Sequence, residues 1–169
     1  MAGALILLQP LTAAAFAPFG DVLECEGAPD KIINQGLCGR YHDRARMDFG
    51  PQGRAGLSLF RAEPRQLPLT LDMVERHPDG SQAFIPMSAH PFVVIVAPDE
   101  SGRPGRPLAF LTAPGQAINF HRGTWHGVLT PLHAPGLFAV VDRIGNTENL
   151  EEHWFDTPYR VAPAGADAP

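Results

Sequence analysis

The sequence predicts an all-β fold, either a sandwich or a barrel, from three observations. Short segments rich in β-branched and aromatic residues recur at regular spacing. The 18 prolines and 17 glycines lie between these segments and follow no linker or collagen period. Hydrophobic residues make up 44% of the 169-residue chain, enough for the core of one domain. We therefore expect a single domain over residues 1–160 and a disordered tail over residues 161–169.

The expected elements follow from local sequence. A short helix is predicted in LTAAAFAPFG, residues 11–20, because Thr12 can cap it, the alanines favour it, and Pro18 and Gly20 end it. A polar loop is expected over residues 99–107, and one late helical turn within residues 146–156. The β-rich segments are residues 21–25, 56–64, 69–80, 81–87, 91–102, 107–115, 117–123, 125–131 and 136–143.

Charge and cysteine content exclude several classes of protein. The net charge is -5 and no basic run is present, which argues against nucleic acid or an anionic membrane as the main partner. Two cysteines, Cys25 and Cys38, are too few for a disulfide framework or a zinc ribbon. The apolar start of the chain lacks a basic region and is broken by Pro10, so we predict neither a signal peptide nor a membrane span. A soluble, cytoplasmic protein is expected.

Strand alternation predicts a polar opening at one end of the barrel. In residues 71–77, Leu71 and Met73 are apolar and should face inward, and Glu75 and His77 share their face. The same alternation pairs Asn119 with His121, and Phe138 and Val140 with Asp142. Polar groups that follow apolar ones on an inward face imply a ligand, a metal or a polar network, because burying them unpaired is costly.

Two spacings match the cupin motifs. Gly115-x5-His121-x-Gly123-x2-His126 fits the second motif, with His121 at the usual proline position. Glu75-x-His77-x4-Gln82 is a degraded form of the first motif. Because both occur in order across a β-rich stretch, we predict a cupin-like double-stranded β-helix, a jelly-roll barrel, with the short N-terminal helix.

From about Leu7 to Asp156 the chain resembles the ureidoglycolate lyase family, formerly called ureidoglycolate hydrolase, which has a cupin-like fold. The resemblance is carried by INQGLCGRYHD (33–43), ERHPDGSQAFIPM (75–87), FVVIVA (92–97), NFHRGTWH (119–126) and VVDR (140–143). It implies cleavage of (S)-ureidoglycolate to glyoxylate and urea in allantoin and purine catabolism. It also implies a homodimer and no organic cofactor.

That reaction indicates candidate residues. A base must take the hydroxyl proton and an acid must protonate the departing nitrogen, so His121 and His126 are the leading pair, with Glu75 and His77 beside them. A cation should hold the carboxylate. The candidate substrate-binding residues are Arg40, Arg61, Tyr41, Gln82 and Asn119; Arg76 and Arg143 are further candidate cations, and by alternation Arg76 faces away from His77.

The cupin-equivalent positions Glu75, His77, Gln82 and His126 form a candidate metal site. Two imidazoles and a carboxylate can hold Ni²⁺, Mn²⁺, Fe²⁺ or Zn²⁺, and nickel is the metal associated with the family. The acid–base route works without a metal, so the sequence leaves this requirement open. Two other functions stay open: a non-catalytic cupin that binds a small carboxylate metabolite as a sensor, and a metal-dependent cupin enzyme of other specificity. The cluster of titratable groups favours an enzyme.

Overall fold

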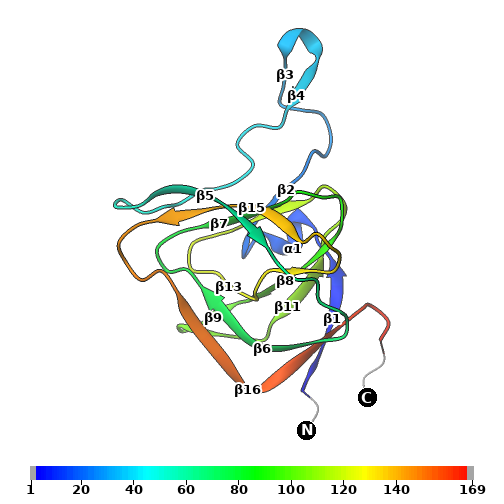
Figure 1. Cartoon of the computed structure of the whole chain (residues 1–169), viewed down its shortest axis with the longest axis vertical. Coiled ribbons are helices and arrows are strands. Elements are labelled where there is room, and N and C mark those ends of the chain that lie inside the picture. Colours follow the sequence, from blue (N-terminus) through cyan, green and yellow to red (C-terminus); the bar gives the residue numbers. More distant parts are fainter. Residues whose placement is uncertain (1–2, 167–169) are drawn as a thin grey trace.

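A computed structural model describes residues 3–166, which form two β-sheets, two small hairpins and one short helix (Figure 1). The predicted all-β class is confirmed. The larger sheet runs in the order β11 (Leu108–Leu111), β1 (Leu5–Pro10), β16 (Glu151–Ala162), β6 (Leu69–Arg76), β13 (Trp125–His126), β8 (Phe92–Ala97) and β14 (Thr130–Pro131). Because β11 also pairs with β8, this sheet closes into a barrel, as expected for a cupin-like fold.

The second sheet packs against one wall of this barrel. Its order is β2 (Gly20–Leu23), β12 (Ala117–Phe120), β7 (Gln82–Pro86), β15 (Leu137–Ile144) and β5 (Arg54–Arg61). The hairpins are β3 (Lys31–Ile33) with β4 (Cys38–Arg40), joined by the 3-10 turn η1 (Asn34–Gly36), and β9 (Asp99–Glu100) with β10 (Arg103–Pro104). The β3–β4 hairpin projects away from the body of the molecule (Figure 1).

Strand β8 separates two hydrophobic cores. Val93 and Ile95 face the interior of the closed barrel, whereas Val94 and Val96 face the second sheet. A strand that is buried on both faces needs a continuous apolar run, which FVVIVA provides.

The predicted N-terminal helix is present as α1 (Ala13–Phe16). The Thr12 hydroxyl accepts a hydrogen bond from the Ala15 amide, as an N-cap does. Phe16 is fully buried in the core between the barrel and the second sheet. The helix therefore covers the end of that core.

The late helical turn predicted within residues 146–156 is wrong, because this segment enters strand β16. One isolated turn gains little, whereas β16 pairs with β6 on one side and with β1 on the other and satisfies its backbone groups. The strand continues through Val161 and Ala162, which are buried, so β16 extends two residues into the segment predicted as a tail, and a turn over residues 163–166 follows it. Residues 167–169 lie outside the described part of the chain.

Alternation along β6 is interrupted, which changes the predicted faces. Leu71 and Val74 are three residues apart, yet both pack inside the closed barrel. The pairing of β6 with β16 shifts register at the same place, between Trp154 and Tyr159. The prediction that Glu75 shares the inward face of Leu71 is therefore wrong: Glu75 follows Val74 and points towards the second sheet.

Among residues 3–166, no helix has the length and apolar character needed to cross a membrane.

Burial of Val161 gives a direct stability test. We expect Val161→Ala to lower the free energy of unfolding by about 2 kcal/mol, because it leaves a cavity in the barrel core. Val128 is 43% exposed, and the matched Val128→Ala should stay within about 0.5 kcal/mol of the unmodified protein. Urea titration of both variants measures this, and equal stabilities would contradict the placement of β16.

Candidate active site

Glu75, His77 and His126 come together between the barrel wall and the second sheet. Strand β13 pairs with β6 so that His126 lies directly opposite Glu75, and opposed residues share a face. His77 follows two residues after Glu75 and points the same way. One side-chain nitrogen or oxygen from each of the three lies within 4.8 Å of the others. We call these residues the triad.

His126 is the most buried member of the triad. Its ring stacks on Phe120 of β12, with centroids 4.2 Å apart, and lies 5.2 Å from the ring of His77. Nδ1 donates to the Gly127 carbonyl at 3.0 Å, so Nε2 carries the lone pair. No hydrogen-bond partner for Nε2 exists among the described residues. Burial, with a smaller contribution from His77, lowers the pKa of His126 to about 3, so the ring is neutral near pH 7.

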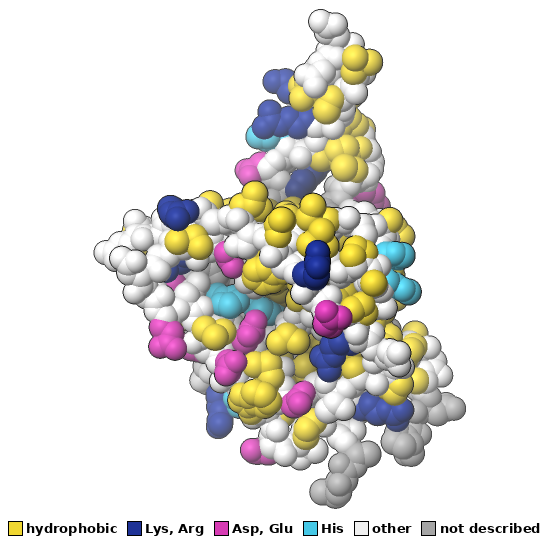
Figure 2. Space-filling model, viewed as in Figure 1, with side chains coloured by type: hydrophobic (Ala, Val, Ile, Leu, Met, Phe, Trp, Pro, Cys, Tyr) yellow, Lys and Arg dark blue, Asp and Glu magenta, His cyan; other side chains and the backbone are white. Residues whose placement is uncertain are grey.

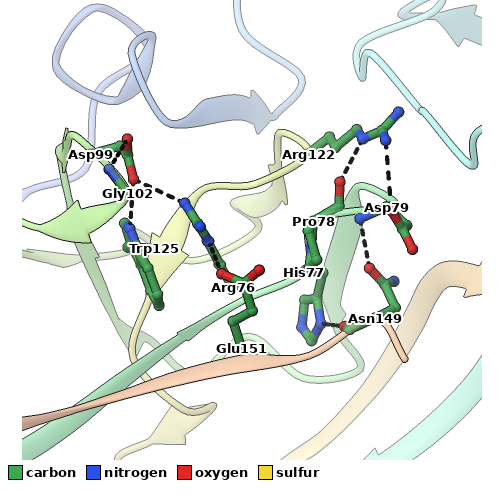
Figure 3. Close-up of polar contacts among 10 residues, drawn as sticks. All are labelled: Arg76, His77, Pro78, Asp79, Asp99, Gly102, Arg122, Trp125, Asn149 and Glu151. Carbon is green, nitrogen blue, oxygen red and sulfur yellow. Dashed lines mark hydrogen bonds and ion pairs between the residues drawn. The ribbon is translucent and has the colours of Figure 1, made fainter. Parts of the chain in front are cut away.

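His77 is held at both ring nitrogens. Nδ1 lies 2.7 Å from the Asn149 carbonyl (Figure 3), and Nε2 lies 3.1 Å from Oε1 of Gln82. The Gln82 amide nitrogen donates to the Asp142 carboxylate at 3.2 Å, which fixes the amide so that its oxygen faces His77. Both nitrogens therefore face oxygen acceptors, and each can donate when it carries a proton.

Glu75 has a half-buried carboxyl group with no hydrogen bond or ion pair to another described residue. Desolvation raises its pKa above the usual value, and the nearby Glu152 adds to this, while His77 acts in the opposite direction. A carboxylate with a raised pKa suits a general base working near neutral pH.

His121 is not brought together with His126, although the two flank the same glycine turn. Phe120 faces the triad, whereas Asn119 and His121 lie on the opposite face of β12. There His121 Nδ1 accepts from the Arg46 guanidinium at 3.1 Å. Its Nε2 lies 3.0 Å from the Asp21 carboxylate, close enough for an ion pair but poorly aligned for a hydrogen bond.

Asn119 belongs to the same second cluster. Its fully buried side chain donates to the Asp21 carboxylate at 3.0 Å and to the Arg46 carbonyl at 3.1 Å. The Arg46 amide donates to the same carboxylate at 2.8 Å, and these hydrogen bonds hold the pKa of Asp21 below its usual value even though burial acts against them. A cavity of about 400 Å³ opens beside His121 and Arg46, and its lining includes no member of the triad.

Three predicted substrate-binding residues do not contact the triad of their own chain. Arg40 ends β4 on the projecting hairpin, and the Tyr41 hydroxyl donates to the Gly27 carbonyl at 2.8 Å. Arg61 pairs with Leu137, five residues from Asp142 along β15, which is about 16 Å of strand.

The arginines nearer the triad in sequence have other partners. Arg76 does face away from His77: it bonds Glu151 at 2.6 Å and Asp99 at 2.9 Å, and its guanidinium lies 4.4 Å from the centroid of the Trp125 ring (Figure 3). Trp125 donates to the same Asp99 carboxylate at 2.9 Å. Trp125 is buried in the barrel core, so these contacts hold Arg76 against the outer part of that core and away from the triad.

Sequence reasoning found some of these residues and missed others. The alternation of Asp142 with Phe138 and Val140 indicated that it faces inward. Its hydrogen bond with Gln82 could be predicted only from the register between β7 and β15. Asn149 acts on His77 through its backbone carbonyl, so its side-chain type gives no signal. Arg46 and Asp21 lie far apart in sequence and carried no motif.

The triad also fits a divalent metal ion. Two imidazoles and a carboxylate are ligands that such ions accept, and the buried Nε2 of His126 has a free lone pair. The Asn149 carbonyl orients His77 through Nδ1, as partners of metal-binding histidines commonly do. Gln82, the fourth predicted ligand, lies beside the triad and bonds His77 and Asp142. On the face of the molecule shown in Figure 2, histidine side chains are recessed between acidic and hydrophobic ones.

Comparison with known proteins places the chain in a family. The family model described as ureidoglycolate lyase matches residues 4–162. A ureidoglycolate lyase of Rhodobacter capsulatus is 58% identical over 156 residues, which is 92% of this chain and 97% of that protein. Ureidoglycolate lyase 2 of Rhizobium meliloti is 55% identical over 155 residues, 91% of this chain and 95% of that protein.

The lowered pKa of His126 predicts a pH dependence of stability. The pKa of His126 is about 6.5 in the unfolded chain and about 3 in the folded chain. Between these two pH values the unfolded chain binds a proton at His126 and the folded chain does not, so lowering the pH decreases the free energy of unfolding. Between pH 7 and pH 5 the free energy of unfolding of the metal-free protein should fall by about 2 kcal/mol more than that of the His126→Gln variant. Urea titrations in the presence of a chelator measure the difference. His133 is exposed, so the His133→Gln control should show the same pH dependence of unfolding as the unmodified protein. If His126→Gln also showed that same pH dependence, His126 would not be a neutral, buried ring.

Proposed function

Because the chain belongs to the ureidoglycolate lyase family, we propose that it cleaves (S)-ureidoglycolate to glyoxylate and urea in purine catabolism. The observation that carries the proposal is the triad: a neutral imidazole, a carboxyl group with a raised pKa and a hydrogen-bonded histidine, in a chain matched to the family over nearly its whole length. The substrate is a carbinolamide, so cleavage converts its hydroxyl into a carbonyl as the carbon–nitrogen bond breaks.

In the proposed mechanism each triad residue has one role. Glu75 takes the hydroxyl proton, because desolvation makes its carboxylate a stronger base than usual. His77 gives a proton from Nε2 to the departing ureido nitrogen, and the Asn149 carbonyl keeps its ring in place. His126 accepts a hydrogen bond from the substrate at Nε2. Glu75 gains the proton of the substrate hydroxyl, and His77 loses one proton to the ureido nitrogen. Transfer of a proton from Glu75 to His77 then returns both residues to their initial protonation states.

The alternative route uses a metal ion held by the same three side chains. A divalent ion would supply a Lewis acid that polarises the hydroxyl group. Nickel is the ion we would test first, although the donor set also suits Mn²⁺, Fe²⁺ and Zn²⁺. In either route Gln82 lies beside His77, and the amide N–H that does not donate to Asp142 is left for the ureido end of the substrate.

We also propose that the protein acts in the cytoplasm as a homodimer. Both cysteines are free, as is usual in a reducing compartment. Leu57 and Leu59 are largely exposed on the outer side of the edge strand β5, and Met87 is exposed near it. A second copy of the chain would cover such apolar positions.

Replacing His126 and His121 separately tests the proposed site. The unmodified protein should release urea and glyoxylate in equal amounts, and His126→Gln should lower kcat/KM by about 10²- to 10⁴-fold while folding normally. His121→Gln should lower kcat/KM by less than about tenfold, because the two ring nitrogens of His121 contact Arg46 and Asp21 rather than the triad. His133→Gln is the control.

Three results would redirect the assignment. Ammonia in place of urea would contradict a lyase. Tight binding of the substrate without turnover would favour the sensor. A larger loss in His121→Gln than in His126→Gln would move the chemistry to the second cluster.

Metal binding can be measured apart from activity. Calorimetric titration of the chelator-stripped protein with Ni²⁺ and Mn²⁺ should show one site per chain if the triad holds an ion. Glu75→Gln should weaken that binding by more than about tenfold, whereas Glu63→Gln, at an exposed position, should leave it unchanged. Equal affinities in the two variants would exclude the triad as the metal site, and activity retained in the stripped protein would favour the metal-free route.

A further inference from the structure

The geometry points to an active site shared between two copies of the chain: Arg40 on the projecting hairpin of one copy binds the substrate carboxylate at the triad of the other. This inference rests on the proposed function, because the substrate of that reaction is an anion. It adds the source of the cation that the reaction needs, because no ion pair joins Glu75 to a cation among the described residues of a single chain.

The triad of a single chain has an excess of acidic groups. Glu75 is one member, Asp142 bonds Gln82 next to His77, and Glu152 is close enough to raise the pKa of Glu75. A carboxylate substrate entering here meets like charges. Recognition of a carboxylate normally uses a guanidinium group, which offers two parallel hydrogen bonds.

The neighbouring arginines have their guanidinium groups directed elsewhere. Arg76 reaches Asp99 and Glu151 on the other face of β6. Arg122 donates to the Pro78 carbonyl at 2.6 Å and lies 3.7 Å from Asp79, so its head group points away from the His77 ring (Figure 3).

Arg143 and Arg46 are engaged as well. Arg143 donates to the Phe49 carbonyl at 2.9 Å and to the Thr147 hydroxyl at 3.0 Å. Arg46 bonds His121 in the second cluster. Within residues 3–166, none of these arginines contacts the triad.

The hairpin, in contrast, carries two cations without acidic partners. Arg40 lies directly opposite Lys31 in the β3–β4 register, and like charges in that position destabilise a pair of strands. Neither has a carboxylate within 4.0 Å among the described residues. The adjacent Asp30 is taken by Arg44 at 2.8 Å and by the His42 amide at 2.9 Å. An acidic site with an anionic substrate would relieve this repulsion.

The hairpin also needs a surface to cover it. Its strands have three residues each, and a lone two-stranded hairpin is marginally stable in water. Ile32 is 58% exposed and Leu37 is 87% exposed. Figure 2 shows cationic and hydrophobic side chains together on this projection. A binding surface for it should therefore combine apolar and acidic groups.

A second copy of the chain has both kinds of group. Leu57 and Leu59 expose apolar surface on the outer face of the edge strand β5, and Glu75 and Asp142 supply acidic charge on the inner side of this sheet, so a hairpin that reaches the triad passes around this edge. In a twofold dimer each copy gives one hairpin and receives one, so the two contacts are equivalent and the assembly closes.

Substitution of Arg40 tests the contribution of the hairpin. Arg40→Ala should lower kcat/KM for ureidoglycolate by about 10- to 100-fold, mainly through a higher KM, because a charged hydrogen bond to the carboxylate is lost. Arg40→Lys should restore part of the loss, since it keeps the charge but not the paired donors. Arg103→Ala, at an exposed position on β10, is the matched control and should have normal kinetics.

Mixing two defective variants tests whether the site is shared. Separately tagged Arg40→Ala and His126→Gln chains are co-expressed and the mixed dimers are purified through both tags. If Arg40 acts across the interface, each mixed dimer has one intact site, so activity should return to about half of the unmodified dimer. If Arg40 acts within its own chain, the activity of the mixed dimers should be only the mean of the activities of the Arg40→Ala and His126→Gln homodimers, and this result would overturn the proposal.

Two further results would also overturn it: normal kinetics in Arg40→Ala, or an unmodified protein that is active and sediments as a monomer. If the unmodified protein has no lyase activity, the proposed function fails instead, and sedimentation of Leu37→Asp still reports whether the hairpin holds a dimer together.

Discussion

The pairing of β13 with β6 is the constraint on which the site depends. β13 has only two residues, and it is held between β6 and β8 where the barrel wall closes. This pairing sends Trp125 into the barrel core and His126 towards the second sheet, opposite Glu75. A change of one residue in this register would exchange the two faces and separate the imidazole from the carboxylate.

Burial then gives the triad its chemistry. Phe120 covers one face of His126, and the ring loses its tendency to take a proton because a charge there would be poorly solvated. The same desolvation makes Glu75 a stronger base. His77 is different: its two partners, the Asn149 carbonyl and the Gln82 amide, set its orientation rather than exclude water. Three residues in one small space thus acquire three distinct roles.

Much of this was predictable, and the failures have physical causes. Local capping predicted α1, and the cupin spacing predicted a barrel with Glu75, His77 and His126 together. Alternation failed along β6 because a register shift opposite Leu71 is set by pairing with a strand distant in sequence. His121 was grouped with His126 from spacing alone. Spacing cannot reveal that His126, on β13 of the larger sheet, faces the inner side of the second sheet, whereas the His121 side chain lies on its outer side. Strand β16 gains its stability from two neighbours and not from its own preferences.

The central claim is that the substrate meets the triad and not the second cluster. Nitrogen NMR of the histidine rings, recorded with N-carbamoylglycine, tests it directly, because this compound is the substrate without its hydroxyl group and is not cleaved. We predict that the Nε2 signal of His126 shifts on binding, since that atom is free to accept a hydrogen bond, while both nitrogens of His121 keep their positions. Shifts at His121 with His126 unchanged would contradict the account.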